Sequence, residues 1–248
     1  MAKYELGNWD LSELVKNPKS PAFEKQIQLV EKKAKKFEKI KSNLNPNMPS
    51  KKFLNLLNDL EVISEKMSVK GGFASLSYAS DTQSDEATSL LTRMTQLGAE
   101  ISNRVLFCDL WWERVVDKKN ARRLINESGD LAQYLRHKRL LAKYSLSEPE
   151  ERIINTLDVT GITALMKLYD KITSAFEYLV KVDGKSKKLT REQLAVLVRN
   201  SKPRTREVSY KSLLTKFKEN KGVLEKSIKI LFLTGRMRVL KFEDIHHQ

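Results

Sequence analysis

The chain has very few residues of the kinds that form disulfides or bind metals. It holds one cysteine and three histidines among 248 residues. Cys108 alone can neither close an internal disulfide nor complete a structural zinc site, which favours a reducing compartment. His137 stands alone among basic residues. The pair His246-His247 lies at the C-terminus, which we expect to fray. No His-Glu-x-x-His string, which would place two imidazoles on one helical face around a general-base Glu, occurs in the sequence. We therefore assign no catalytic residue, no cofactor-binding residue and no metal ligand.

Glycine and proline are also scarce, with 9 and 6 residues respectively. Few turn-forming residues favour a small number of long helices over many short strands. Hydrophobic residues make up 40% of the chain and charged residues 31%, which is typical of an ordered, soluble protein. No apolar leader follows Met1, and no stretch approaches membrane-spanning length. We expect a cytoplasmic protein with no membrane partner.

Acidic residues are too few to balance the basic ones, and the formal net charge is +15. The excess is uneven, because residues 181–248 hold 18 Lys and Arg against 7 Asp and Glu. The first 180 residues hold 28 against 24. A charge excess confined to one end is explained by a solvated face or an acidic neighbour at least as well as by nucleic acid. Nucleic acid is therefore disfavoured as a partner.

Apolar residues recur at helical spacing in most of the chain. The first long helix is predicted to begin at Ser20-Pro21, because proline is well tolerated in the first helical turn. Its lysines, such as Lys32 and Lys36, are expected mostly on the side that faces water. The predicted buried face of this helix consists of Phe23, Ile27, Val30, Ala34 and Phe37.

A second helix is predicted from about Phe53, and Gly71-Gly72 should weaken or kink it. The central helix has the longest periodic stripe, and we expect only one of Trp111 and Trp112 to face the core. A single further helix is predicted from about Ala121 to Tyr144. The central stripe comprises Leu90, Met94, Leu97, Ile101, Val105, Cys108, Trp112 and Val115.

The remaining elements follow from capping and turn signals. A short helix is expected after Asp10, another long one after Ser147, and a short one after Thr190. Residues 182–185 are predicted to form a turn, and Pro203 opens a last long helix. No strand stands out. We expect an all-α fold, a bundle of long antiparallel helices with no significant sheet.

Several polar residues have both a functional and a structural interpretation. His137 fits a solvated basic face better than a metal site, and Cys108 fits a core position better than a nucleophile. Arg204 and Arg206 fit hydration or ion pairs to another domain better than phosphate binding. Helix capping explains a group of carboxylates better than acid–base or metal chemistry, namely Asp81, Asp85 and Glu86.

Five strings, in a characteristic order and spacing, are similar to the N-terminal half of the oligoendopeptidase F family. This resemblance covers about residues 5–230. The strings are Trp9-Asp10-Leu11-Ser12, Leu76 to Thr82, Leu146 to Glu151, Val182-Asp183-Gly184, and Ser201 to Arg206 followed by Tyr210.

The resemblance implies a helical domain that covers a zinc-peptidase domain and limits its channel to short peptides. In the family, the zinc-binding string and a further Glu lie downstream of the matched region. Residues 1–188 then form the helical N-terminal domain, 189–234 the first helices of a truncated peptidase domain, and 235–248 an aberrant tail. The expected function is that of an N-terminal fragment of a zinc metalloendopeptidase, inactive alone. Its partners are the missing C-terminal catalytic domain and, in the full-length relative, short peptides.

The tail from Gly235 departs from the family pattern, where Trp-x-x-Glu and an Arg-rich stretch are expected. One permitted back-translation, shifted by one nucleotide, restores a sequence of that kind. The tail is thus interpreted as out-of-frame coding, although a natural truncation or a cloning boundary is also open. Two other hypotheses remain: a stand-alone basic helical module that binds RNA or an acidic protein, and a scaffold or inhibitor that caps another peptidase.

Overall fold

The computed structural model of the protein describes residues 10–182, 184–230 and 232. The predicted tail 235–248, with His246 and His247, lies outside the described residues. The chain forms two compact units, Met1–Leu157 and Asp158–Gln248. The domain boundary predicted after residue 188 follows the family resemblance and not the compact units. It stays a prediction. In the described part of the chain, no helix is both long and apolar enough to cross a membrane.

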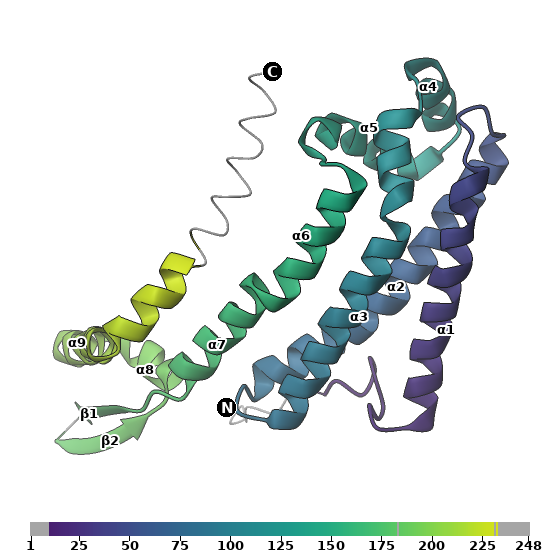
Figure 1. Cartoon of the computed structure of the whole chain (residues 1–248). Coiled ribbons are helices and arrows are strands. Elements are labelled where there is room, and N and C mark those ends of the chain that lie inside the picture. The colour runs from purple at the N-terminus through teal and green to yellow at the C-terminus, as the bar shows by residue number, and fades with distance from the viewer. Residues whose placement is uncertain (1–9, 183, 231, 233–248) are drawn as a thin grey trace, which may run out of the picture. The chain divides into compact units, whose positions relative to one another are not determined.

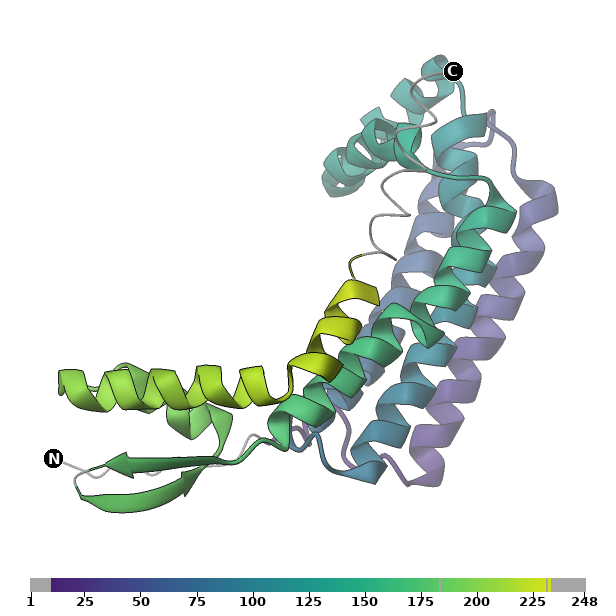
Figure 2. The same cartoon turned by 60° about the vertical axis from the view of Figure 1, so that its left-hand side comes forward.

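Three long helices form the first unit: α1 (Pro21–Glu38), α2 (Ser50–Ser80) and α3 (Asp85–Leu110), which pack side by side (Figures 1 and 2). The Ser20 hydroxyl accepts a hydrogen bond from the Phe23 N–H at 3.2 Å and so caps α1. All five apolar residues predicted for its inner face are buried. The expected start and buried face of this helix are confirmed.

The prediction that Gly71-Gly72 would weaken or kink α2 is not matched by a break, because the helix continues through both glycines. Phe53 and Ile63 are buried before the pair, and Phe73 and Tyr78 are buried after it. Packing on both sides holds the helix together against the cost of about 1 kcal/mol that each mid-helix glycine imposes.

A π-helical turn, Trp111–Val115, follows α3 directly. It is closed by a hydrogen bond from the Val116 N–H to the Trp111 carbonyl at 3.1 Å. The expectation that only one tryptophan faces the core is wrong, because Trp111 and Trp112 are both buried. The wider turn rotates the residues beyond it, so that Val116 is buried in place of Val115, which is exposed.

The helix predicted from Ala121 to Tyr144 is two helices, α4 (Lys118–Asn126) and α5 (Ala132–Leu141). The break is at Gly129, whose φ of 52° lies in the left-handed region. Short 3₁₀ turns cover Gly129–Leu131, Ala142–Tyr144 and, after α1, Lys39–Asn43. The short helix expected after Asp10 is only a turn, in which Asp10 Oδ1 accepts a hydrogen bond from the Ser12 N–H at 2.9 Å.

The helix α6 (Glu148–Thr160) crosses from the first unit into the second, which continues with α7 (Ile162–Ser174). Two strands follow, β1 (Tyr178–Val182) and β2 (Lys185–Leu189). The helices α8 (Arg191–Val198) and α9 (Pro203–Glu219) come next, and residues 221–230 are helical as well. Thr190 caps α8 as predicted.

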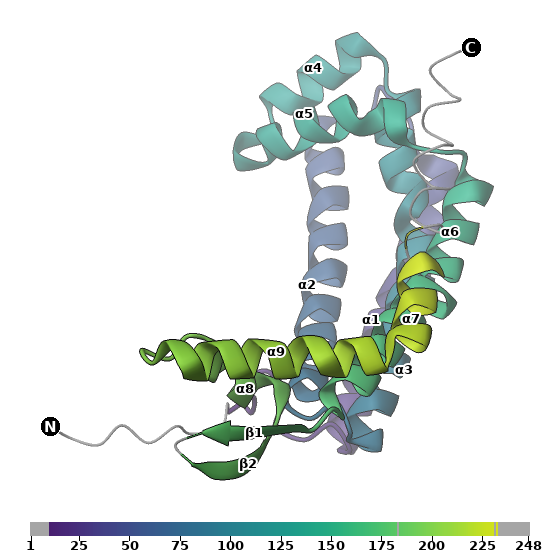
Figure 3. The same cartoon turned by 90° about the vertical axis from the view of Figure 1, so that its left-hand side faces the viewer.

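The turn of this hairpin was predicted, but its two strands were not. It pairs antiparallel from Tyr178 with Leu189 to Val182 with Lys185, and Gly184 in the turn has a φ of 79°. Figure 3 shows the hairpin beside α9. The core of this unit comprises Phe176, Tyr178, Val180, Val182, Leu194 and Leu224. The chain is nevertheless helical in nearly all of its described elements, and the predicted all-α class is confirmed.

Two glycine substitutions should change stability in opposite directions. A Cβ added at Gly71 or at Gly129 meets no atom within 4 Å, so only the backbone differs between them. Gly71→Ala should raise the free energy of unfolding by about 0.5–1 kcal/mol, because alanine favours a helix interior. Gly129→Ala should lower it by about 1 kcal/mol, because of the positive φ. Urea unfolding followed by circular dichroism measures both, and equal effects would contradict the described backbone.

Candidate functional site

Residues that commonly bind metals are scattered in the described part of the chain. Over residues 10–182, 184–230 and 232, no three His, Cys, Asp or Glu side chains gather closely enough to hold a metal ion. His137 is exposed on α5. The described residues do not fit the zinc that the family resemblance implies, and no step of metal chemistry is assigned to them.

Cys108 lies on the buried side of α3 with 3% of its surface exposed. Burial, with a further contribution from the neighbouring Asp109 carboxylate, raises the pKa of its thiol to about 12. The thiolate is the nucleophilic form, and it is almost unpopulated at neutral pH. The prediction that Cys108 is a core residue agrees with this burial.

The acidic residues before α3 belong to the start of that helix. The cap itself is Ser84, whose hydroxyl accepts a hydrogen bond from the Ala87 N–H at 3.2 Å. Asp81 Oδ1 accepts from the Gln83 N–H at 3.0 Å, while Asp85 and Glu86 occupy the first turn. Carboxylates at this position are stabilised by the helix dipole. The three carboxylates thus lie at the start of the helix as predicted, but the capping side chain is Ser84 and none of them.

Arg206 has a local structural role that the sequence did not suggest. Its Nη1 donates hydrogen bonds to the carbonyls of Asn200 and Ser201, each at 2.9 Å. These bonds fix the loop that precedes α9. Arg206 is nevertheless exposed, so the expectation of hydration or an ion pair to another domain stays a prediction.

Polar side chains lock the end of α3 to α5. Arg139 Nη1 donates to the carbonyls of Trp112 at 2.7 Å and Val116 at 2.8 Å. Its guanidinium lies 5.5 Å from the centre of the Trp112 ring, and the Trp112 indole N–H donates to the Leu135 carbonyl at 3.0 Å. Sequence reasoning placed Arg139 on a solvated face with His137. Its position four residues from Leu135, on the same face of a helix, was the available signal.

Charged groups around this lock pair with one another. Lys138 Nζ lies 2.8 Å from Asp109 Oδ2. Burial opposes the charge on Lys138, but the charge and hydrogen bond of Asp109 outweigh it, and the pKa of Lys138 is raised. Burial also opposes the charge on Glu113 and so raises the pKa of this carboxyl. The hydrogen bond that its Oε2 accepts from Ser145 Oγ at 2.5 Å acts in the opposite direction. These contacts hold the π-helical turn in place.

Exposed apolar side chains gather on α9 and the residues that follow it. Tyr210 and Leu214 lie four residues apart on α9. Ile228 and Phe232, after the end of α9, are also four residues apart. Concentrations of exposed apolar residues of this kind mark interaction surfaces. We call this set the C-terminal apolar surface; its members are 47–67% exposed, and they are Tyr210, Leu214, Val223, Ile228, Ile230 and Phe232.

Comparisons with known proteins show what this chain is similar to. Residues 115–178 match the family model described as Oligopeptidase F. The crystal structure of oligoendopeptidase-F from Enterococcus faecium is similar with a TM-score of 0.73 and 16% identity, covering 88% of this chain and 42% of that one. A putative peptidase from Chlamydophila abortus has a TM-score of 0.49 and 14% identity, covering 90% of this chain and 38% of that one, which is too weak to support an argument. No curated protein matches.

The predicted resemblance to the oligoendopeptidase F family, over its N-terminal part, is thereby confirmed. The matched segment begins at the end of the π-helical turn and runs through α7 to the start of β1, so it includes Arg139. The chain spans less than half of the length of either solved structure.

The buried thiol should be unreactive while the first unit is folded. A pKa of about 12 leaves roughly one thiol in ten thousand ionised at pH 8. A thiol-specific chromogenic reagent should therefore label Cys108 only after denaturation, and faster in native protein as the pH rises toward 12. Complete labelling of the native protein within seconds at pH 8 would contradict the buried position.

Replacing Arg139 should destabilise the first unit. Lysine lacks the planar guanidinium that lies over the Trp112 ring and whose Nη1 donates to both carbonyls, so Arg139→Lys should lower the free energy of unfolding by about 1–3 kcal/mol. Arg136→Lys on the same helix is the matched control, because Arg136 is exposed. The control should change stability by less than about 0.5 kcal/mol in urea unfolding. Equal losses would show that the two hydrogen bonds add nothing.

Proposed function

We propose that the chain is the N-terminal helical part of an oligopeptidase F-like zinc metalloendopeptidase that hydrolyses short peptides. The observation that carries the proposal is the family match of residues 115–178. The likeness in fold to oligoendopeptidase-F over 88% of this chain supports it. In this role the helices limit access to a peptidase domain and admit only short, flexible peptides.

The chain supplies no hydrolytic chemistry of its own in this proposal. Its sequence has no His-Glu-x-x-His string, so no helix places two imidazoles and a general base around one metal. Zinc and the activated water belong to the peptidase domain. The described helices contribute shape, exclusion and a surface on which that domain packs.

The C-terminal apolar surface is the part of the chain that would meet the peptidase domain. Burying a leucine or isoleucine that is half exposed contributes on the order of 1 kcal/mol. The exposed members of this set would add to that contact in proportion to the apolar area it covers. With that surface open, the chain should associate with itself.

Self-association tests this assignment. The double variant Leu214→Glu/Ile228→Glu should weaken self-association at least about tenfold in sedimentation velocity, because two carboxylates would be buried in the contact. Leu140→Glu is the matched control, since Leu140 is 70% exposed but lies on α5 in the first unit. A chain that stays monomeric at about 100 µM, or that loses association equally in the control, would count against a docking role for this surface.

Hydrolysis of fluorogenic short peptides tests the inert role directly. The purified chain should release no more fluorescence than buffer, with or without added zinc. Turnover that a chelator abolishes would overturn the view that this chain lacks its own catalytic centre.

A further inference from the structure

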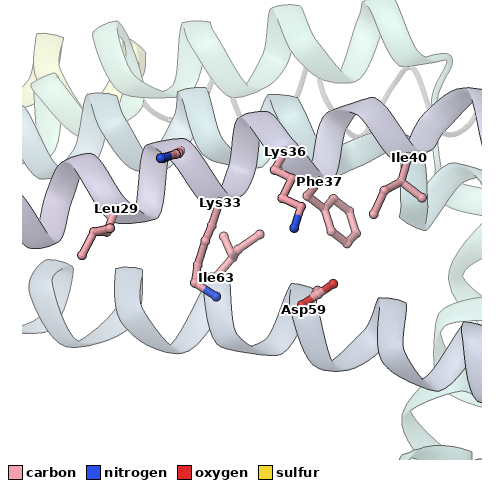
Figure 4. Close-up of a pocket in the computed structure, with 8 residues that line it drawn as sticks. Leu29, Lys33, Lys36, Phe37, Ile40, Asp59 and Ile63 are labelled. Carbon is pink, nitrogen blue, oxygen red and sulfur yellow. The ribbon is translucent and has the colours of Figure 1, made fainter.

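A groove runs between α1 and α2 in the first unit (Figure 4). Its volume is about 340 Å³, within the range of ligand-binding clefts. Phe37 and Ile63 are almost fully buried at its base, and Leu29 and Ile40 extend the apolar surface along α1. The groove therefore presents an apolar floor that a partner could cover.

The groove continues toward the end of α1. Ile40 and Asp59 also line a second hollow, of about 200 Å³, that reaches Met48 and Lys52. From Leu29 to Ile40 the floor spans about 16 Å, at 1.5 Å per helical residue. About three turns of another helix fit along such a length.

Unpaired positive charge borders the groove. Lys32, Lys33 and Lys36 line it on the side of α1, and the described residues give none of the three an ion pair. Figure 4 shows Lys33 reaching toward α2 beside Ile63. Asp59 is the single acidic residue among those that line it.

Two of the three carboxylates of α1 are paired with α3, and the third, Glu31, does not line the groove. Glu24 lies 2.5 Å from Arg93, and Glu38 lies 2.7 Å from Arg104, both on α3. The two sides of α1 are therefore electrostatically different, with balanced charge toward α3 and excess positive charge along the groove. A ligand for this groove should be both apolar and acidic.

We propose that the α1–α2 groove binds one amphipathic helix of a partner protein that carries an apolar stripe flanked by Asp and Glu. Apolar side chains at positions i, i+3 or i+4, and i+7 would lie along the groove and cover Leu29 and Ile40, above the already buried Phe37 and Ile63. Carboxylates beside that stripe would pair with Lys33 and Lys36. The proposal does not rest on the peptidase assignment, because none of the residues that line the groove lies in the matched segment 115–178.

Other occupants fit these observations less well. A second copy of the chain would offer α9, whose exposed apolar residues stand among lysines and arginines rather than carboxylates, and it would not balance the lysines of the groove. Nucleic acid would gain from the lysines but not from an aliphatic floor. A planar anionic membrane matches a convex basic face better than a concave groove between two helices.

A labelled synthetic helix of about 18 residues, with a leucine stripe flanked by glutamates, is the probe. Fluorescence anisotropy with the full chain should give micromolar binding that weakens as salt is raised. A scrambled peptide of the same composition lacks the stripe, and a peptide with lysine in place of glutamate lacks the acidic charge. Both should bind at least about tenfold more weakly.

Two charge-reversal variants on α1 locate the site. Lys33→Glu/Lys36→Glu places two carboxylates in the groove and should weaken binding of the striped acidic peptide by about tenfold or more. Lys25→Glu/Lys35→Glu changes the net charge by the same amount on exposed positions outside the groove, and it should weaken binding less than about threefold. Circular dichroism confirms that both variants fold.

Carbodiimide cross-linking of the peptide to the unmodified chain locates the bound peptide without any substitution. Cross-links at Lys32, Lys33 or Lys36 support the proposal, and cross-links only elsewhere overturn it. Equal losses in the two variants, equal binding of the scrambled peptide, or no binding up to about 100 µM would also overturn it. So would single-stranded RNA or phosphatidylserine vesicles binding at the groove while the peptide does not.

Discussion

The arginine that closes the end of α3 fixes the geometry of the first unit more than any other single group. Arg139 reaches from α5 to the Trp112 carbonyl in the π-helical turn and to the Val116 carbonyl just after it. A π-helical turn leaves backbone acceptors poorly matched, and a charged planar donor compensates for that loss. Because the turn is held open, Trp111 and Trp112 both point into the core and pack near Phe53 of α2. The directions of α4 and α5 follow from that one distortion.

Local sequence signals predicted those parts of the fold whose energetics are local. Ser20 and Pro21 mark the start of α1, and a strict apolar period marks its buried face, so both could be inferred without knowing any neighbour. Thr190 and Gln193 form a complete capping box for the same reason. Elements that depend on distant partners could not be inferred. The π-helical turn requires Arg139, which lies more than twenty residues downstream, and the continuity of α2 requires burial on α3.

The hairpin shows a different limit of sequence reasoning. Tyr178, Val180 and Val182 alternate with exposed residues, but the run is short and follows a helical rhythm that leads into it. Its partner, Lys185–Leu189, is mostly lysine and serine and has no apolar alternation at all. Such a strand forms because β1 beside it is buried against α8 and α9, not because of its own preferences. For the candidate sites, composition correctly directed attention away from Cys108 as a nucleophile, whereas the role of Arg206 depended on a loop that no pattern described. The lysines of α1 could be placed on an outer face, but only the packing of α1 on α2 showed the apolar floor between them.

The burial of Cys108 makes the chain well suited to site-specific spectroscopy. Its only native thiol is inert in the folded state, so the unmodified protein contributes almost no background to maleimide labelling. One cysteine introduced at an exposed position would thus carry a fluorophore or spin label at a single defined place. The native thiol would at the same time report unfolding of the first unit, since it becomes accessible only when α3 leaves the core.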